Sequence, residues 1–257
     1  VDEDTSLAIT GISVADDDDN LATVQLSVTN GSLNVTLSGS ASLSAGANDS
    51  DDLTLSGTLA DINATLATLS YQGNLDFNGS DTLTMLSTDG NAVTDSDTIA
   101  ITVSAVNDEE VLATNTGTTV AEGSAGTVIS SAMLATSDVD NTAAQLTYTV
   151  DSAPSNGTLR LNGSALALND AFTQADIDAG LVTYDHNGSQ TSTDAFDFTV
   201  DDGAGTATSA TFSIGVTNVN DAPVNTVPGA QTVDEDTSLA ITGISVADDD
   251  DNLATVQ

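Results

Sequence analysis

Apolar and polar residues alternate over short stretches along most of the chain. The clearest examples read TIAITVSAV, LTYTV, FDFTV and ATFSIGV, at residues 98–106, 146–150, 196–200 and 210–216. A period of two is typical of a strand with one buried face, and Thr, Val and Ile favour strands. The pattern therefore predicts short β-strands at these positions.

Turn signals divide these strands from one another. They are Asn30-Gly31, Asp89-Gly90, Asn156-Gly157 and Asp202-Gly203, all dipeptides that favour hairpin turns. About seven short strands in roughly 115 residues is typical of a β-sandwich. Residues 58–69 and 173–181 depart from this pattern, and Thr173 precedes Asp176 by three positions, as in a capped helical turn. We expect one brief helix in each of these two stretches.

The chain repeats itself on two scales. Residues 1–25 match residues 233–257 at every position, and AVND at 105–108 returns as NVND at 218–221. Upstream of each Asn-Asp pair the segments align, so that Asp61, Tyr71, Asp81 and Asp89 correspond to Asp176, Tyr184, Asp194 and Asp202. Self-similarity of this kind indicates tandem modules. Two diverged copies of one module therefore make up the longer repeat.

These repeats predict the domain organisation. Residues 1–108 form a module that lacks its first strand, residues 109–221 form a second module, and residues 222–257 form a linker and the start of the next copy of the first module. Pro223 and Pro228 predict an extended linker. Because both ends fall inside a repeat, we expect the chain to be a fragment of something longer.

The charge of the chain excludes several classes of function. There are 39 acidic residues against one arginine, with no lysine. A chain without cations cannot neutralise phosphates, which excludes binding to nucleic acid or to anionic lipid. There is no cysteine for disulfides or thiolate metal sites, and no apolar run of membrane-spanning length.

The acids are of an informative kind, because only five of the 39 are glutamates. Aspartate favours turns and is a common ligand of hard cations. The balance predicts loops that bind a divalent metal, most simply Ca²⁺, and adaptation to high salt is the alternative. Since crowded carboxylates without counter-ions should weaken folding, metal binding should be coupled to it.

Four kinds of acid-bearing segment recur in step with the modules. They are an early glutamate (Glu3, Glu122, Glu235), an acidic box (14–20, 136–141, 246–252), an Asp-Gly turn (Asp89 and Asp201-Asp202) and a closing Asn-Asp (Asn107-Asp108 and Asn220-Asp221). Carboxylates two positions apart can point to one side of a turning loop. Ca²⁺ takes six to eight oxygen ligands, so ligands pooled from several loops suit it better than they suit Mg²⁺.

The ordered recurrence of these segments resembles cadherin-type repeats. Module two, from LTYTVDSAPSNGTLRL through FTQADIDAGLVTYDHNGS to FDFTVDDGAG, looks like the cadherin-like repeats of chondroitin sulfate proteoglycans. The linker VNDAPV followed by VDEDTSLAITGISVAD looks like the tandem modules of giant bacterial surface adhesins. The resemblance implies an all-β fold of tandem Greek-key β-sandwich modules of cadherin/immunoglobulin-like type. It also implies Ca²⁺ between successive modules.

Carried onto this sequence, the resemblance gives two groups of metal ligands. The first pools Glu3, Asp89, Asn107 and Asp108 with Asp138 and Asp140, and the second pools Glu122, Asp201, Asp202, Asn220 and Asp221 with Asp248 and Asp250. The early glutamates Glu3 and Glu235 should face the junction ahead of their module. Asp16 and Asp18 of the first acidic box should face the junction behind. The acidic-Arg-Glu motif of cadherins is missing, which leaves the number of ions per junction open.

Other conspicuous residues favour structural interpretations. His186 is a lone histidine in a turn-like stretch, and Arg160 should either pair with a neighbouring carboxylate or pack its stem on the sheet. No nucleophile elbow is present, and the chain has no tryptophan to form a sugar platform. We therefore expect no enzymatic activity.

The function predicted from the sequence is a Ca²⁺-rigidified extender of a long extracellular adhesin or surface fibre. Its partners would be the neighbouring modules of its own chain, and like chains if it forms a fibre, without membrane insertion. One alternative is a repeat unit of a self-assembling extracellular filament or sheath. Another is a Ca²⁺-dependent module that binds a glycan or a protein.

Overall fold

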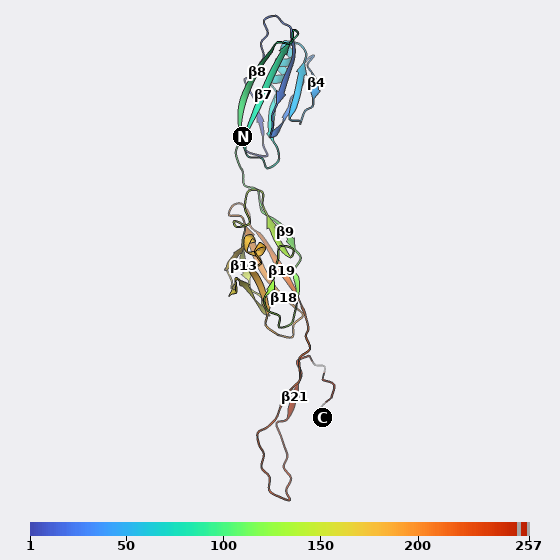
Figure 1. Cartoon of the computed structure of the whole chain (residues 1–257), viewed down its shortest axis with the longest axis vertical. Coiled ribbons are helices and arrows are strands. Elements are labelled where there is room, and N and C mark those ends of the chain that lie inside the picture. The colour runs from blue at the N-terminus through green and yellow to red at the C-terminus, as the bar shows by residue number, and fades with distance from the viewer. Residues whose placement is uncertain (251–252, 256–257) are drawn as a thin grey trace. The chain divides into compact units, whose positions relative to one another are not determined.

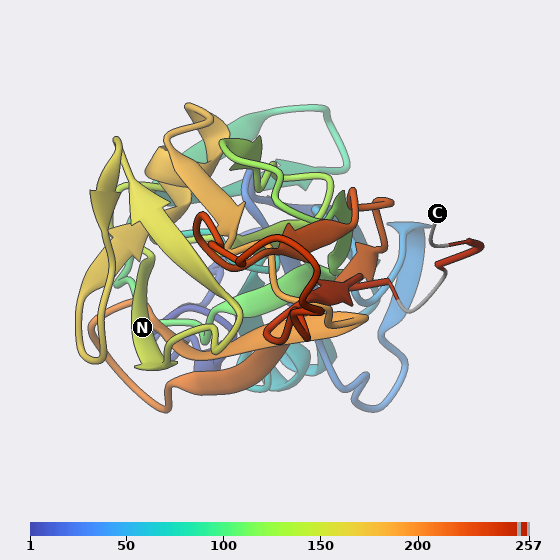
Figure 2. The same cartoon turned by 90° about the horizontal axis from the view of Figure 1, so that it is seen from below.

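A computed structural model describes residues 1–250 and 253–255 of the chain. The chain divides into two compact units, Val1–Asn107 and Asp108–Gln257. Their strands and helices can be followed by colour in Figure 1 and, from below, in Figure 2. The last two residues of the third acidic box, 251–252, and residues 256–257 of the repeated segment lie outside the described residues. The separation of residues 222–257 as a part of its own stays a prediction.

Unit 1 is a sandwich of a five-stranded and a three-stranded sheet, with strand orders β4-β5-β2-β7-β8 and β1-β6-β3. The residues that point between the sheets form its core and include Leu26, Leu55 and Tyr71, all fully buried. Helix α1 closes one side with Ile62 and Leu66. The elements are β1 Ser6–Ala8, β2 Leu21–Ser27, β3 Gly31–Asn34, β4 Ser42–Gly46, β5 Asp52–Ser56, α1 Leu59–Leu66, β6 Ser70–Gly73, β7 Gly79–Asp89 and β8 Thr94–Val103.

Unit 2 repeats this plan with more strands. Its sheets have the orders β10-β19-β18-β13-β16, β11-β17-β14-β15, β12-β9 and β20-β21. The core is aromatic, and the rings of Tyr148 and Phe172 stack with centroids 5.0 Å apart. The elements are β9 Val111–Asn115, β10 Thr118–Ala121, β11 Thr127–Val128, β12 Leu134–Ser137, β13 Thr147–Ser152, β14 Gly157–Leu161, β15 Ser164–Ala165, β16 Ala171–Thr173, α2 Gln174–Asp178, β17 Val182–His186, β18 Thr193–Asp201, β19 Thr208–Thr217, β20 Val224–Thr226 and β21 Ser245–Ala247.

The predicted fold class is confirmed. The structure is all-β apart from two short helices among the described residues, and both helices lie where the sequence predicts them. Helix α2 begins with the predicted capping box. The Thr173 side chain accepts from the Asp176 N–H, and the Asp176 carboxylate accepts from the Thr173 N–H. No helix in the described part of the chain is long and apolar enough to cross a membrane.

A tyrosine and an aspartate fix the same turn in both units, and this turn joins strands of two different sheets (β2 to β3, and β13 to β14) and so is not the hairpin predicted at Asn30-Gly31 and Asn156-Gly157. The Tyr71 hydroxyl donates to Asp81 Oδ2 at 3.1 Å, and the Tyr184 hydroxyl donates to Asp194 Oδ2 at 2.7 Å. Each aspartate also accepts two backbone N–H groups from the turn before a glycine. A Cβ on that glycine, Gly31, would lie 2.4 Å from the Tyr71 ring. The aligned Tyr and Asp positions therefore mark one shared structural device.

Asp81 makes the stability of unit 1 depend on pH. Burial raises the pKa of Asp81, but hydrogen bonds from Asn30, Thr82, Thr29 and Tyr71 together hold it below its ordinary value. A lowered folded-state pKa adds stability above the unfolded pKa of about 3.9, and this stability is lost as pH falls through the folded pKa. Thermal melts between pH 6 and pH 2 should therefore fall more steeply for the wild type than for Asp81→Asn. Parallel curves would contradict this assignment.

The two identical 25-residue segments separate local from tertiary causes of structure. Both place an aspartate and a glycine at positive φ: Asp4 at 55° and Asp236 at 59°, Gly11 at 79° and Gly243 at 78°. Burial differs, because Ile9 is 7% exposed while its copy Ile241 is 55% exposed. The turns therefore follow from the local sequence. The buried packing needs the rest of the module, with which the first copy packs in the structure.

The predicted linker contains a strand. Val224–Thr226 forms β20 and pairs with β21, whose sequence SVA is that of residues 13–15. In the second module β9 and β12 pair in the same way. The segment between Pro223 and Pro228, which the sequence predicts as an extended linker, therefore includes a strand at residues 224–226. These residues instead form a strand that pairs with the next copy of the repeat.

Candidate metal sites at the module ends

Each module has two ends at which acidic loops collect. We call the end where the last strand leaves the trailing end, and the opposite end the leading end. In unit 1 the antiparallel hairpin β7–β8 runs from the pair Gly79 and Val103 to the pair Thr88 and Thr94 (Figure 1). At about 3.4 Å per residue this places the two ends roughly 30 Å apart. Ligands at opposite ends of one module cannot share an ion.

The early glutamates lie at the trailing ends. Glu3 donates its backbone N–H to Ser104, and its Oε1 accepts from the Val106 N–H at 2.7 Å. In unit 2, Glu122 donates its N–H to Thr217, and its Oε2 accepts from the Val219 N–H at 3.2 Å. Glu3 is 3% exposed. The last strand thus holds the same carboxylate in the same way in both modules.

Three carboxylates meet at the trailing end of unit 2. Oxygens of Glu122, Asp221 and Asp250 all lie within 4.8 Å of one another. Asp221 donates its backbone N–H to Asp250, and the Gln190 side chain donates to Glu122 at 2.6 Å and to Asp221 at 2.9 Å. The structure thus brings together three residues predicted to share a site. Asn220 lies beside them and donates to the Asp221 carbonyl at 3.0 Å.

The acidic boxes form one loop geometry in three places. The second aspartate of each Asp-x-Asp donates its N–H to Oδ1 of the first: Asp140 to Asp138 at 2.7 Å, Asp18 to Asp16 at 3.0 Å, and Asp250 to Asp248 at 3.2 Å. The linker aspartate then donates to the second, and Asp108 does so to Asp140 at 2.8 Å. Both predicted carboxylates of the second and third boxes, and Asp16 of the first, are therefore fixed by backbone groups.

The predicted positions of Asp89, Asp201 and Asp202 are wrong. Asp89 ends β7, and the neighbouring Gly90 donates to Asn20, so Asp89 lies at the leading end with the first acidic box. Asp201 ends β18, and Asp202 follows it at the leading end of unit 2. An Asp-Gly turn and the Asn-Asp that closes the module are separated by one whole strand, which carries them to opposite ends. They therefore do not join Glu3 or Glu122.

The remaining predicted ligands are placed as follows. Asn107 is the last residue of unit 1 and Asp108 the first of unit 2. Glu235 is exposed, although its sequence copy Glu3 is buried. The predicted pooling of ligands across the first junction stays a prediction.

Sequence reasoning missed two side chains at these ends. Gln190 bridges Glu122 and Asp221, but the sequence gives no sign of this role because glutamine is uncharged. Glu110 is 5% exposed, and its Oε1 accepts from the Thr208 N–H at 2.9 Å. Its signal was available, because Glu110 stands where the next repeat has Pro223.

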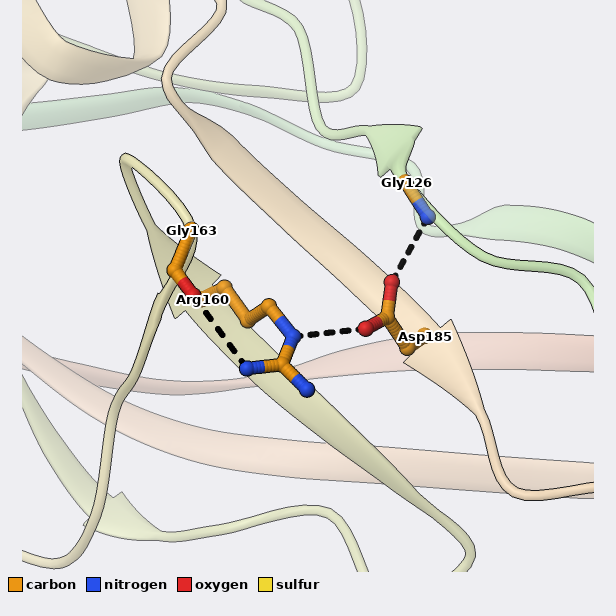
Figure 3. Close-up of polar contacts among 4 residues, drawn as sticks. All are labelled: Gly126, Arg160, Gly163 and Asp185. Carbon is orange, nitrogen blue, oxygen red and sulfur yellow. Dashed lines mark hydrogen bonds and ion pairs between the residues drawn. The ribbon is translucent and has the colours of Figure 1, made fainter.

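The single arginine is bound elsewhere. Arg160 Nε lies 2.6 Å from Asp185 Oδ2, and its Nη1 donates to the Gly163 carbonyl at 3.2 Å (Figure 3). The Gly126 N–H and then Arg160 hold the pKa of Asp185 below its ordinary value. His186 is buried, and its Nδ1 accepts from the N–H groups of Gly123 and Gly188. Both residues thus have the structural roles expected of them, and Arg160 is not paired with the acids of the ends.

The unsatisfied atoms at these ends fit a hard cation. Several buried side-chain oxygens accept no hydrogen bond from the described residues: Glu3 Oε2, Asp16 Oδ2, Asn20 Oδ1, Glu110 Oε2 and Asp138 Oδ2. A buried carboxylate without a partner is unfavourable by several kcal/mol. Ca²⁺ is bound by oxygen ligands of this kind, including carboxylates and side-chain amides. The donor set is therefore appropriate for Ca²⁺.

Comparison with known proteins gives matches over both modules. Residues 111–216 match the family model described as Cadherin-like, and residues 9–98 match that described as Protein GAMETE EXPRESSED 2 domain. The human mucin-like protocadherin EC1-2 structure aligns with a TM-score of 0.44 at 16% identity, covering 85% of this chain and 94% of that one.

Two curated relatives are similar in sequence. The mouse extracellular matrix organizing protein FRAS1 is 36% identical over 108 residues, which is 41% of this chain and 3% of the relative. Human chondroitin sulfate proteoglycan 4 is 38% identical over 108 residues, 42% of this chain and 4% of the relative. The chain thus matches only a small part of these long proteins. Residues 111–216 are thus similar to the Cadherin-like family, and the chain is similar in sequence to a part of FRAS1 and of chondroitin sulfate proteoglycan 4.

Proposed function

We propose that this chain is an extender of a long extracellular adhesin or surface fibre, in which Ca²⁺ bound at the module junctions converts a flexible chain into a stiff one. Its role is mechanical, without enzymatic activity. The matrix protein among its relatives and the large excess of acidic residues, 39 against one arginine that is bound to Asp185, support this proposal. The tandem modules of bacterial surface adhesins, which the linker resembles, are the proposed setting.

The observation that carries the proposal is the group of Glu122, Asp221 and Asp250. Glu122 belongs to the end of one module, Asp221 to the following linker, and Asp250 to the opening of the next repeat. Three different parts of the chain therefore converge on one point. A shared ligand at that point would tie the end of one module to the start of the next.

The residues themselves set the balance between the flexible and stiff states. Two carboxylates about 4.8 Å apart repel each other by about 3–4 kcal/mol at an effective dielectric constant of about 20. Backbone N–H groups of Val219 and Asp221 and the Gln190 amide hold the oxygens in place against this repulsion. Bound Ca²⁺ would supply the positive charge that offsets it. Without the ion, repulsion favours separation of the three segments.

Small-angle X-ray scattering on the full chain tests this mechanism. Chelation of Ca²⁺ should remove the longest distances from the pair-distance distribution, because the junctions become flexible. Asp221→Asn should show part of this loss even in millimolar Ca²⁺, since it weakens one junction only. Asp97→Asn removes an exposed carboxylate in the middle of β8 and is the matched control, expected to behave as wild type. Identical profiles with and without Ca²⁺ would count against stiffening.

A further inference from the structure

We propose that Glu110 is an additional cation ligand at the leading end of unit 2, so that divalent ions bind there more tightly than at the corresponding place beside Asp248. This inference rests on the proposed function and deepens it. It makes the two kinds of junction in the repeat unequal. The junction with Glu110 would bind its ions more tightly, and the junction with Pro223 would combine weaker ion binding with the stiffness of its prolines.

Glu110 is an unusual glutamate for this surface. Its side chain is 5% exposed, whereas its neighbour Glu109 is exposed. One carboxylate oxygen accepts from the Thr208 N–H at 2.9 Å, and the other, Oε2, is buried without a hydrogen-bond partner. An ionised oxygen in this position needs a positive partner. Arg160, the single arginine, is engaged by Asp185.

The sheet register brings a second such carboxylate to the same end of the sheet. The antiparallel ladder of β9 and β12 ends at the pair Val111 and Ser137, and Glu110 and Asp138 are the residues next to this pair on the two segments. Asp138 Oδ1 accepts the N–H groups of Asp140 and Asn141, while Oδ2 is buried without a partner. Two carboxylates that flank the last pair of the ladder therefore each keep one buried, unsatisfied oxygen.

The pair of oxygens suits a hard divalent cation. Ca²⁺ accepts six to eight ligands and completes its shell with backbone carbonyls and water, so it needs only a few carboxylates from the protein. Monovalent cations offer less charge to offset two carboxylates. Glu110 is placed here by the strand pairing and by its bond to Thr208, which makes it a preformed ligand.

The chain contains its own comparison for this site. At the next junction the corresponding ladder ends at the pair Val224 and Ala247, so Pro223 has the place of Glu110 and Asp248 that of Asp138. The rest of the local geometry is kept, because Asp221 donates to Asp250 as Asp108 donates to Asp140. Proline offers no side-chain ligand. The two leading-end sites thus differ by a carboxylate at this position.

Calorimetric titration of the calcium-free full chain with Ca²⁺ tests the inference. Glu110→Gln should weaken one class of sites about tenfold, or remove one ion from the stoichiometry, and leave the other sites unchanged. Glu109→Gln is the matched control, because it removes the same charge from an exposed position that is one residue away from Glu110. It should change the affinity less than twofold. Pro223→Glu should tighten binding at the second junction.

The outcomes separate this inference from the proposed function. Equal titrations of Glu110→Gln and Glu109→Gln would overturn the role of Glu110 while the wild type still binds Ca²⁺. A wild-type chain that takes up no Ca²⁺ would overturn the proposed function as well. If Glu110→Gln does not fold in saturating Ca²⁺, Pro223→Glu decides, since an unchanged affinity there contradicts the inference.

Discussion

Chelation of Ca²⁺ should lower the melting temperature of the chain by about 10–20 °C. A ligand present at 100 times its dissociation constant stabilises the folded state by about 2.7 kcal/mol per site. A change of about 1 kcal/mol shifts the melting temperature of a domain of 60–100 residues by about 4–8 °C. Differential scanning calorimetry in millimolar Ca²⁺, and again with excess chelator, measures the effect. A shift in melting temperature of this size corresponds to one occupied Ca²⁺ site per module.

Screening must be separated from binding in this experiment. With a net charge of −38, the chain is stabilised by any salt that weakens repulsion among its carboxylates. A chelated sample in NaCl of matched ionic strength is therefore the control, and Mg²⁺ tests the choice of ion. Only Ca²⁺ should restore the full melting temperature. If NaCl restored the melting temperature as fully as Ca²⁺ does, the carboxylates would act only through general electrostatic repulsion. If chelation left the melting temperature unchanged, the hypothesis that the carboxylates bind Ca²⁺ would be contradicted.

Asp81→Asn should lower the free energy of unfolding of unit 1 by about 3 kcal/mol. Asp81 is 5% exposed and accepts hydrogen bonds from the N–H groups of Thr29, Asn30 and Thr82 and from the Tyr71 hydroxyl. The asparagine amide has the shape of the carboxylate, but an NH2 donor replaces one of its two acceptor oxygens. This NH2 group would face the N–H and O–H donors that bind Asp81. Hydrogen bonds to charged groups are worth about 1.5–3 kcal/mol each, and unsatisfied buried groups add to the loss. Denaturant melts in saturating Ca²⁺ measure the difference.

Two variants bracket that result. Tyr71→Phe removes a single donor from Asp81 and should cost about half as much. Asp97→Asn, an exposed change in the neighbouring β8, should stay within about 0.5 kcal/mol of wild type. If Asp81→Asn were as stable as Asp97→Asn, the Tyr–Asp device would be incidental to the fold. The corresponding device at Tyr184 and Asp194 should leave the melting of unit 2 unchanged in all three variants.

Local patterns in the sequence were enough to predict the sandwich. Alternation of polar and apolar residues identified the strands around Tyr148, Phe198 and Phe212, because these side chains alternate between core and solvent. The capping box at Thr173 needed only a spacing of three. The correspondence of Tyr71 with Tyr184 was visible as a repeat before its cause was known. Each of these features depends on neighbours in the sequence or on a fixed period.

The arrangement of the ligands needed the topology. Asp89 and Asp202 recur at constant spacing from the closing Asn-Asp, so the sequence indicates that they belong to the same module but not to which end. That question is answered by the antiparallel direction of β7 and β8, and of β18 and β19. The role of Glu110 likewise depends on the β9–β12 register. Charge alone could not separate it from the exposed Glu109.

The exact repetition of the first 25 residues also bears on how such a chain is synthesised. The two copies adopt the same turns, but Ile9 of the first copy is buried while Ile241 of the second is exposed. A segment of this kind can dock on any body of matching sequence, and misassembly between domains is a characteristic failure of repeat proteins. Here the second copy starts at residue 233, with a diverged module in between. The alternation of two dissimilar modules keeps interchangeable segments apart and so protects the nascent chain from strand exchange between neighbours.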